Sequence, residues 1–334
     1  MARIHVKPDG LDFESRGRRD YLVTFEHPSL WGSYLVPVTV IVGPQARPGR
    51  GLASTGSTHG NEYEGPVALK HLAREIRTED VLGRVVLIPV LNAVAFKAGR
   101  RDSPDDGANL NRAFPGDAKG TITSRIADFV TRFVFPQVHV VLDLHAGGQV
   151  ARFPALASMH WVDDAAQRSE MVETARGFGC RFLLFYQNST PGLLTSTAET
   201  LGKVTVGGEF GWGEAVQAEG VSMCRQGVLT AAIRHEQLRG PAPANRHHKE
   251  QVVVDTADPA STTLAAFDGH FEPVAALGQK VARGERIAYL HDFGRIDDAP
   301  FEIVAPHDGH VVCQAWGTRV FAGQVVSQVG RIVS

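Results

Sequence analysis

Strand-like apolar runs alternate with helical patterns over most of the first 240 residues of this 334-residue chain. The strand-like runs cover residues 35–42, 52–57, 84–90, 138–144, 182–186 and 204–206. The helical patterns cover residues 65–77, 123–135, 163–179 and 221–238. The runs are continuously apolar, which is typical of parallel strands that are buried on both faces. The alternation predicts an α/β fold with a mostly parallel mixed sheet covered by helices, and strands within residues 1–50 would lead into it.

The alternation ends at Gly240, where two prolines stand in a polar stretch that cannot continue a helix. We expect a linker over residues 240–251, between a first domain at residues 1–239 and a second domain at residues 252–334. Glycines recur at short intervals in the second domain, which favours a small all-β structure.

Two segments of the second domain, residues 276–287 and 320–329, are similar to each other. They resemble the repeated units of a biotinyl/lipoyl-like sandwich, in which the turn before an Ala-Pro unit carries a modified lysine. That turn reads Asp297-Asp-Ala-Pro-Phe-Glu-Ile here and contains no lysine. We therefore expect a small all-β sandwich without a carrier function.

The charge balance gives no electrostatic reason to bind nucleic acid, because 34 Lys and Arg stand against 36 Asp and Glu, a net charge of −2. The chain has no run of about 18 apolar residues, and its first ten residues contain no signal-peptide segment. Three distant cysteines argue against a disulfide framework. We expect a cytoplasmic protein with a small-molecule substrate and no membrane partner; self-association into a homo-oligomer stays open.

His59 and Glu62 lie between a predicted strand and a predicted helix, in the segment Gly-Ser-Thr-His-Gly-Asn-Glu-Tyr-Glu-Gly. Their spacing of three places them on one face of a first helical turn, where an imidazole and a carboxylate can converge on one cation. The motif alone is weak, since His247 and Glu250 repeat it in the predicted linker. We interpret that second copy as a solvated polar run.

His145 supplies a third candidate ligand, because it follows the apolar run 138–144 and precedes Ala-Gly-Gly. In open α/β sheets, ligands bind outside the carboxyl ends of the strands. A catalytic zinc usually takes three protein ligands and keeps one position for water. The sequence thus predicts a metal site of His59, Glu62 and His145. Asp143 is either a partner of a ligand imidazole or an ordinary carboxylate at a strand end.

A polar loop over residues 100–116 places Asn111 beside Arg112. A guanidinium group binds a carboxylate through two parallel hydrogen bonds, so this pair suits a substrate carboxylate. Read without the metal motif, the same loop would be a solvated surface segment.

As a set, these motifs resemble the succinylglutamate desuccinylase/aspartoacylase family of the zinc-carboxypeptidase superfamily. The motifs are His59-x-x-Glu62, Asn109-Leu-Asn-Arg112 with Arg101 upstream, Asp143-Leu-His145, and Gly208-Glu209-Phe-Gly211. The likeness extends over residues 35–239, and the small β domain also matches the family's architecture. Within the family, residues 56–65 and 109–116 are most similar to the deacetylases of ectoine degradation, which implies Nα-acetyl-L-2,4-diaminobutyrate as substrate.

The resemblance implies a zinc-dependent amidohydrolase with a zinc-carboxypeptidase-like fold and one Zn²⁺ per chain, held by the three predicted ligands. It implies that Glu209 is the general base that takes a proton from the attacking water and later returns it to the leaving amine. Glu199 and Glu214 are nearby alternatives in the sequence, but neither has a comparable position at a strand end.

The resemblance also implies that Arg101 polarises the scissile carbonyl, and that Asn111 and Arg112 bind the substrate carboxylate. One departure bears on the substrate. Aspartoacylases carry a further arginine about ten residues before the catalytic glutamate, whereas this chain has Thr-Ala-Glu-Thr-Leu-Gly there, with Glu199. A glutamate in that place suits a substrate whose side chain bears an amine.

Three alternatives remain beside the deacetylase. A desuccinylase or aspartoacylase-like enzyme would act on an acidic N-acyl amino acid. A carboxypeptidase would act on peptides, although the added β domain is expected to exclude long chains. A non-catalytic carrier or binding protein would leave the three ligand candidates without a role.

Overall fold

The computed structural model describes residues 4–29, 31–245 and 249–333. Parallel strands form the centre of its main sheet, in the order β5 (Arg84–Ile88), β4 (Gly51–Gly56), β6 (Val138–Leu144) and β10 (Val204–Glu209). These strands are apolar and almost entirely buried, because helices cover both faces of the sheet. The predicted α/β architecture is confirmed.

Further strands extend the sheet on both sides of this centre, each side beginning with an antiparallel pair, β3 (Ser33–Val42) with β5 and β8 (Leu156–Trp161) with β10. On one side lie β3, β2 (Gly17–Glu26) and β1 (Ile4–Val6). On the other side lie β8 and β9 (Phe182–Asn188). Because β8 runs antiparallel to β10, the carboxyl end of β8 lies toward the start of β10. This reversal brings one further histidine to the cavity described below.

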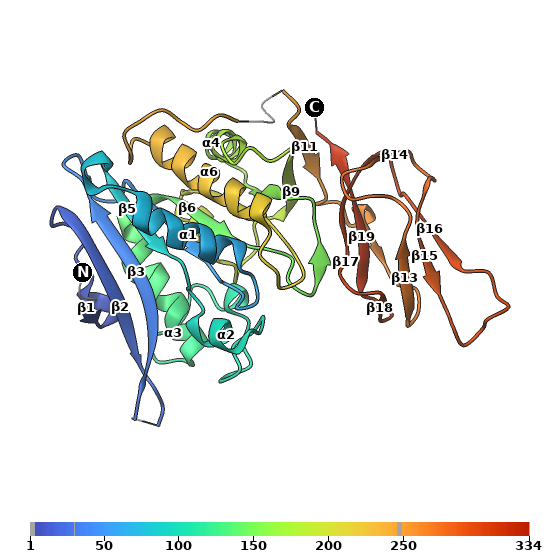
Figure 1. Cartoon of the computed structure of the whole chain (residues 1–334), viewed down its shortest axis with the longest axis horizontal. Helices are drawn as coiled ribbons and strands as arrows, with labels where there is room; N and C mark the ends of the chain where they lie inside the picture. Colours follow the sequence, from blue (N-terminus) through green and yellow to red (C-terminus); the bar gives the residue numbers. More distant parts are fainter. Residues whose placement is uncertain (1–3, 30, 246–248, 334) are drawn as a thin grey trace.

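Two sets of helices cover the sheet, one on each face (Figure 1). The first set is α1 (Glu64–Glu75), α4 (Ala165–Arg176) and α6 (Ala218–Arg234). The second set is α2 (Ala93–Ala98), α3 (Ile122–Phe129) and α5 (Leu194–Glu199). Leu69, Met171 and Val228 belong to the hydrophobic core under the first set. Phe129 and Leu194 belong to the separate core under the second set.

The main sheet continues into the C-terminal part through β11 (Val252–Asp255), which pairs with β9 in parallel and with β19 (Val325–Ile332) antiparallel. Around β19 lie β12 (Thr262–Leu264), β17 (Gly309–Ala315), β14 (Lys280–Val281) and β7 (Ala151–Arg152). A second, antiparallel sheet contains β16 (Phe301–Val304), β15 (Arg286–His291), β13 (Gly269–Pro273) and β18 (Arg319–Val320).

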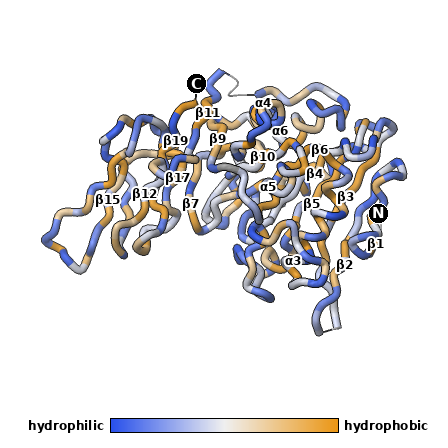
Figure 2. Tube along the Cα trace, turned by 180° about the vertical axis from the view of Figure 1, so that it is seen from behind, coloured by the Kyte–Doolittle hydropathy of each residue, from blue (hydrophilic) through white to orange (hydrophobic). Residues whose placement is uncertain are grey.

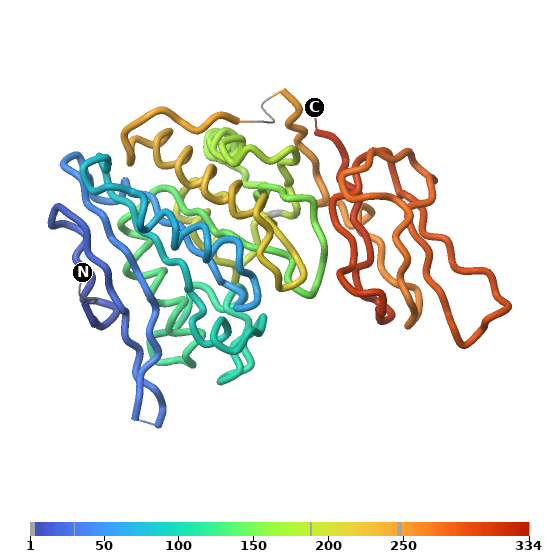
Figure 3. Tube along the Cα trace, viewed as in Figure 1, coloured from blue at the N-terminus to red at the C-terminus, as the bar shows by residue number. Residues whose placement is uncertain are grey.

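Apolar side chains such as Phe271, Leu290 and Val311 form a third core within this C-terminal part. Figure 2 shows the corresponding hydrophobic colouring along β15 and β17, and a hydrophilic tip between β15 and β16. In Figure 3 the N-terminal strands and the C-terminal sheets lie at opposite ends of the molecule. In the part of the chain that the structure describes, no helix combines the length and apolar character needed to cross a membrane.

All the strands and helices predicted between residues 35 and 238 are present, with small shifts at their ends. The helix predicted over residues 123–135 leaves α-geometry after Phe129, and a π turn (Val130–Val134) and a 3-10 turn (Phe135–Gln137) follow. Further 3-10 turns cover Pro8–Gly10, Thr78–Asp80, Leu110–Arg112 and Pro259–Ser261. In the predicted linker, residues 240–245 form neither helix nor strand, and residues 246–248 lie outside the described residues.

Candidate active site

Three neighbouring parallel strands end at one place in the sheet. His59 and Glu62 follow β4, His145 follows β6, and Glu209 is the last residue of β10. The order β4–β6–β10 makes these strands direct neighbours. The chain leaves β4 through Ser57, whose φ of 54° turns the backbone toward α1. The predicted site residues therefore meet because the carboxyl ends of adjacent parallel strands share an edge.

Glu62 lies at the centre of the cluster. One of its oxygens, Oε1, is 2.8 Å from His59 Nδ1, and the other, Oε2, is 2.9 Å from His145 Nδ1. The backbone N–H of Ala146 donates to the same Oε2 at 3.0 Å. One ligand atom from each of His59, Glu62 and His145 lies within 4.8 Å of the others, so one cation can contact all three.

The second nitrogen of each histidine ring is also held. His145 Nε2 is 2.8 Å from Asp143 Oδ2, and His59 Nε2 is 3.2 Å from Asn109 Oδ1. Asp143 is itself fixed, because the hydroxyls of Thr55 and Thr58 donate to its Oδ1. Of the two roles left open for Asp143, the geometry supports that of partner to a ligand imidazole.

The chemistry of this donor set fits a divalent cation. Burial lowers the pKa of His59. Burial also opposes the charged form of His145, but Asp143 and Glu62 outweigh it and raise the pKa of that imidazole well above its usual value. A cation bound to the two Nδ1 atoms and the carboxylate would satisfy these negative charges without a proton. Two imidazoles and one carboxylate are a frequent catalytic zinc set.

Glu209 faces this cluster with a carboxyl group that lacks partners. Its Oε2 is buried and has no hydrogen-bond partner among the described residues, while its neighbours in the chain are tied to His145 by backbone hydrogen bonds. Burial, aided by the charge of Glu62, raises the pKa of Glu209 to about 8. A carboxyl group with a pKa near neutrality can both accept and return a proton.

Three loop residues complete this end of the site. Arg101 donates to Glu62 Oε1 at 3.1 Å, and about a third of its side chain is exposed. Asn111 accepts a hydrogen bond from the backbone of Leu194 at 3.0 Å. Arg112 donates to the carbonyl oxygen of Asn111 at 2.6 Å, so it lies along its own loop. All three predicted residues line the same cavity as His59, His145 and Glu209, a cavity of about 270 Å³.

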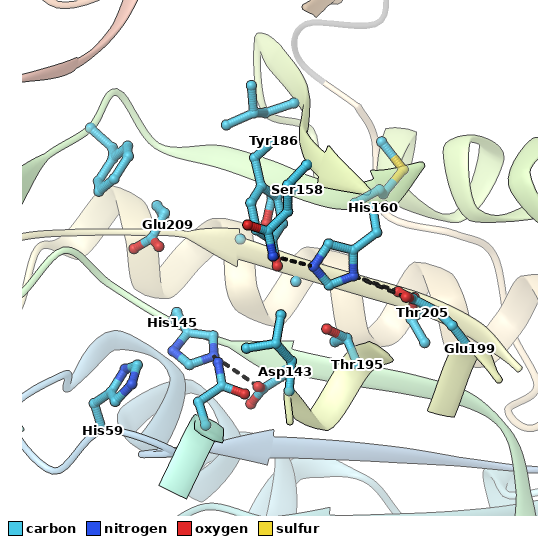
Figure 4. Close-up of a pocket in the computed structure, with 18 of the residues that line it drawn as sticks. His59, Asp143, His145, Ser158, His160, Tyr186, Thr195, Glu199, Thr205 and Glu209 are labelled. Carbon is cyan, nitrogen blue, oxygen red and sulfur yellow. Dashed lines mark hydrogen bonds and ion pairs between the residues drawn. The ribbon is translucent and has the colours of Figure 1, made fainter. Parts of the chain in front are cut away.

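Glu199 lies in the wall at the other end of this cavity, where Figure 4 shows it beside His160. Both of its oxygens contact His160 Nδ1, at 3.0 and 2.9 Å. The hydroxyl of Thr205 donates to Oε1 at 2.7 Å, and the hydroxyl of Ser189 donates to Oε2. The substrate-binding role of Glu199 stays a prediction, and its carboxylate already has partners on both oxygens.

His160 and other residues of this end were not among the predicted site residues, since β8 and its reversed direction were not predicted. The additional lining residues include Ser158, Tyr186, Gln187 and Thr195. The Tyr186 ring lies 4.6 Å from that of His160. The mostly apolar segment Leu156-Ala-Ser-Met159 was the available signal for this strand.

Glu214, an alternative base, lies outside this lining. The side-chain amides of Asn61 and Gln149 donate to its two oxygens, at 2.8 and 2.6 Å. Its carboxylate is therefore occupied, in contrast to that of Glu209. The geometry favours Glu209 over Glu214 as the base.

The chain is similar to known proteins over most of its length. The family model for the succinylglutamate desuccinylase/aspartoacylase catalytic domain matches residues 48–234. The N-alpha-acetyl-L-2,4-diaminobutyric acid deacetylase of Halomonas elongata is 34% identical over 330 residues, which cover 97% of this chain and 94% of that protein.

Two solved structures share the whole architecture. The product-bound ectoine utilization protein EutE from Ruegeria pomeroyi has a TM-score of 0.88 and 31% identity, over 96% of this chain and 97% of that chain. The succinylglutamate desuccinylase/aspartoacylase from Rhodobacter sphaeroides has a TM-score of 0.89 and 30% identity, over 97% and 98%. The chain belongs to the succinylglutamate desuccinylase/aspartoacylase family and is an amide-hydrolysing enzyme.

Proposed function

We propose that this enzyme removes the acetyl group from Nα-acetyl-L-2,4-diaminobutyrate in ectoine degradation, with one zinc ion held by His59, Glu62 and His145. The observation that carries the reaction type is the buried, unpartnered Oε2 of Glu209 beside three converging ligand atoms. The observation that supports the substrate is the name of the 34% identical relative, together with the ectoine utilization title of a structural neighbour.

Two residues beside the metal ligands hold the ligand imidazoles in place. Asp143 and Asn109 fix the orientation of the two imidazoles, so that both Nδ1 atoms point at the Glu62 carboxylate. A zinc ion bound there would act as a Lewis acid toward the amide carbonyl and lower the pKa of a water molecule. The contribution of the chain is a set of donors whose orientations are fixed by hydrogen bonds.

Glu209 moves the proton. Its Oε2 accepts a proton from water as the water oxygen attacks the acetyl carbon. The same carboxyl group then donates that proton to the amide nitrogen, which becomes the amine as the C–N bond breaks. The products are acetate and the free amino acid, and the carboxylate of Glu209 is restored.

The arginines stabilise charge on the substrate. The guanidinium group of Arg101 can donate to the carbonyl oxygen as negative charge develops on it. Asn111 and Arg112 lie on the loop that borders the cavity and would bind the α-carboxylate of the amino acid. The cavity volume of about 270 Å³ suits a small acylated amino acid better than a peptide chain.

Side-by-side kinetics test this proposal. The purified enzyme, with its zinc content measured by mass spectrometry, is assayed with Nα-acetyl-L-2,4-diaminobutyrate, N-acetylaspartate and N-succinylglutamate. We expect acetate release from the first substrate with a kcat/KM at least about 10²-fold above the two dicarboxylates. A higher kcat/KM on either dicarboxylate would replace the deacetylase with the acidic-substrate alternative.

A further inference from the structure

We propose that His160, held by Glu199, accepts a hydrogen bond from the side-chain ammonium of the substrate and thereby selects cationic over neutral or acidic side chains. This inference rests on the proposed deacetylase function and assigns a role to the end of the same cavity that Glu199 and His160 line. His160 is then the residue that contacts the substrate, and Glu199 is a positioning residue that acts through it.

The hydrogen bonds of Glu199 determine which nitrogen of His160 carries a proton. Glu199 accepts from the hydroxyls of Thr205 and Ser189, and its two oxygens both face His160 Nδ1. An ionised carboxylate is an acceptor only, so Nδ1 must carry the hydrogen. The other nitrogen, Nε2, then carries the lone pair of the neutral imidazole, and the side-chain amide nitrogen of Gln187 lies 3.4 Å from it. A substrate ammonium would take the place of this amide as the donor to Nε2.

With a neutral imidazole at position 160, this end of the cavity carries a negative charge. The Glu199 carboxylate is buried, and its partners at this end are the His160 imidazole and two hydroxyls. Among the described residues, the arginines that line the cavity are Arg101 and Arg112, and both contact groups at the other end. A buried charge is tolerated best when an opposite charge pairs with it. A substrate ammonium hydrogen-bonded to His160 Nε2 would supply that charge.

The floor of the cavity connects the two ends along β10. Residues 205, 207 and 209 of this strand share one face, because side chains alternate. Thr205 lies at the Glu199 end and Glu209 at the metal end, four residues apart, or about 13 Å along the strand. Between them stands Gly207, which also lines the cavity and where a Cβ would lie 3.2 Å from Ser158 Oγ.

The length of the proposed substrate matches this floor. Five bonds separate the acyl carbon of Nα-acetyl-diaminobutyrate from its side-chain nitrogen, an extended span of about 6 Å. A contact of about 3 Å at each end brings the total to about 12 Å. A substrate with its acyl group beside Glu209 can therefore reach His160 with its amine (Figure 4).

A comparison of variants and substrates tests the inference. The substrate pair is Nα-acetyl-L-2,4-diaminobutyrate and Nα-acetyl-norvaline, in which a methyl group replaces the ammonium group. The variants are Glu199→Gln and His160→Gln, and the matched control is Glu173→Gln, an exposed glutamate on α4. The preference of each enzyme is the ratio of kcat/KM for the cationic substrate to that for the neutral substrate.

We expect Glu199→Gln and His160→Gln to lower this ratio about 10- to 100-fold, mainly through KM for the cationic substrate, because kcat/KM for Nα-acetyl-norvaline should fall by a much smaller factor. The Glu173→Gln control should keep the wild-type ratio. A purely structural role would lower kcat/KM for both substrates by the same factor. A ratio within threefold of wild type would overturn the inference.

A measurement on the wild-type enzyme keeps the inference testable if a variant fails to fold. Nitrogen-15 NMR of histidine-labelled enzyme distinguishes the Nδ1–H tautomer from the Nε2–H tautomer and the imidazolium ion. We expect one histidine signal of the Nδ1–H type to shift when diaminobutyrate binds and to stay when norvaline binds. An imidazolium signal with that behaviour would overturn the inference. If wild type releases acetate from neither compound, the proposed function itself fails, which is a separate result.

Discussion

Two buried glutamates, one behind the His59 and His145 end of the cavity and one in the wall at its other end, each contact histidine, yet their surroundings suit them to different tasks. Glu62 faces the Nδ1 atoms of two histidines and the guanidinium group of Arg101. Glu199 faces one histidine and two hydroxyl groups. The lone pairs of the two imidazoles beside Glu62 can bind a cation, whereas the hydroxyl groups beside Glu199 donate hydrogen bonds that only stabilise its carboxylate. A glutamate in contact with histidine can thus belong either to a set of metal ligands or to a site with a fixed negative charge, depending on its other partners.

The two carboxylates share one electrostatic property. Burial alone would raise the pKa of both groups. The histidines lower the pKa of Glu62, and hydrogen bonds from His160, Ser189 and Thr205 lower that of Glu199. Both groups are therefore ionised near neutral pH, so the difference between them lies in what their partners can bind. The following predictions test that difference.

The largest effect is expected from His145→Ala, which removes a ligand at the Glu62 end. Zinc content should fall to near zero, and activity should be lost with it, because two ligands bind a catalytic metal poorly. Metal analysis and acetate release measure the two outcomes. The control is His71→Gln, an exposed position on α1. His145→Ala protein that keeps one zinc per chain would contradict the ligand assignment.

Glu209→Gln should keep the fold and the zinc but lower kcat about 10²- to 10⁴-fold, because an amide cannot accept the proton of the attacking water. Steady-state kinetics with metal analysis provide the measurement. Glu214→Gln is the matched control, since its carboxylate is occupied by Asn61 and Gln149. If Glu214→Gln lost the activity and Glu209→Gln kept it, the two roles would have to be exchanged.

Gly207→Ala places a methyl group between the two ends of the cavity. Its Cβ would lie 3.2 Å from Ser158 Oγ, a contact that a small shift can relieve. We expect kcat/KM to fall about 10- to 100-fold for cationic and neutral substrates alike, because the substrate can no longer cross the floor of the cavity. The Tm should stay near that of wild type and of Gly317→Ala, a surface control. Wild-type kinetics would show that substrate does not lie over Gly207.

The smallest effect concerns stability at low pH. The folded-state pKa of Glu199 is lowered from 4.5, so the ionised group stabilises the fold above that pH, and this contribution is lost as the pH falls through the folded value. In chelator-treated protein, the free energy of unfolding should fall more steeply between about pH 5 and 3 for wild type than for Glu199→Gln. Urea unfolding across this range measures the slopes. Parallel slopes would mean that Glu199 is not stabilised in the folded state.

The convergence of the four residues around Glu62 could be predicted from the sequence because it depends on strand ends. His59, Glu62, His145 and Glu209 follow or end apolar parallel strands, and parallel strands bring their carboxyl ends together regardless of the details of packing. The role of Asp143 could not be decided from the sequence, because it depends on which ring nitrogen of His145 the carboxylate contacts.

The end of the cavity around His160 was harder to predict from the sequence because it depends on the reversed direction of β8. His160 lies on an antiparallel strand, and 39 residues separate it from Glu199. Glu199 was identified through a resemblance, yet its hydroxyl partners follow no motif. Such contacts are specified by packing between elements, which a local pattern does not contain.

The pairing of β11 with β9 also determines whether the border of the catalytic sheet is exposed. A strand at the border of a sheet exposes unpaired N–H and C=O groups that can recruit another chain. Here β11 pairs with the edge of β9, and β19 pairs with the other edge of β11. Apolar residues of β9, such as Leu184, also pack with Val254 of β11 and Val312 of β17. Residues 252–333 therefore protect the border of the catalytic sheet, and an enzyme cut after Arg239 should aggregate through a bare β9.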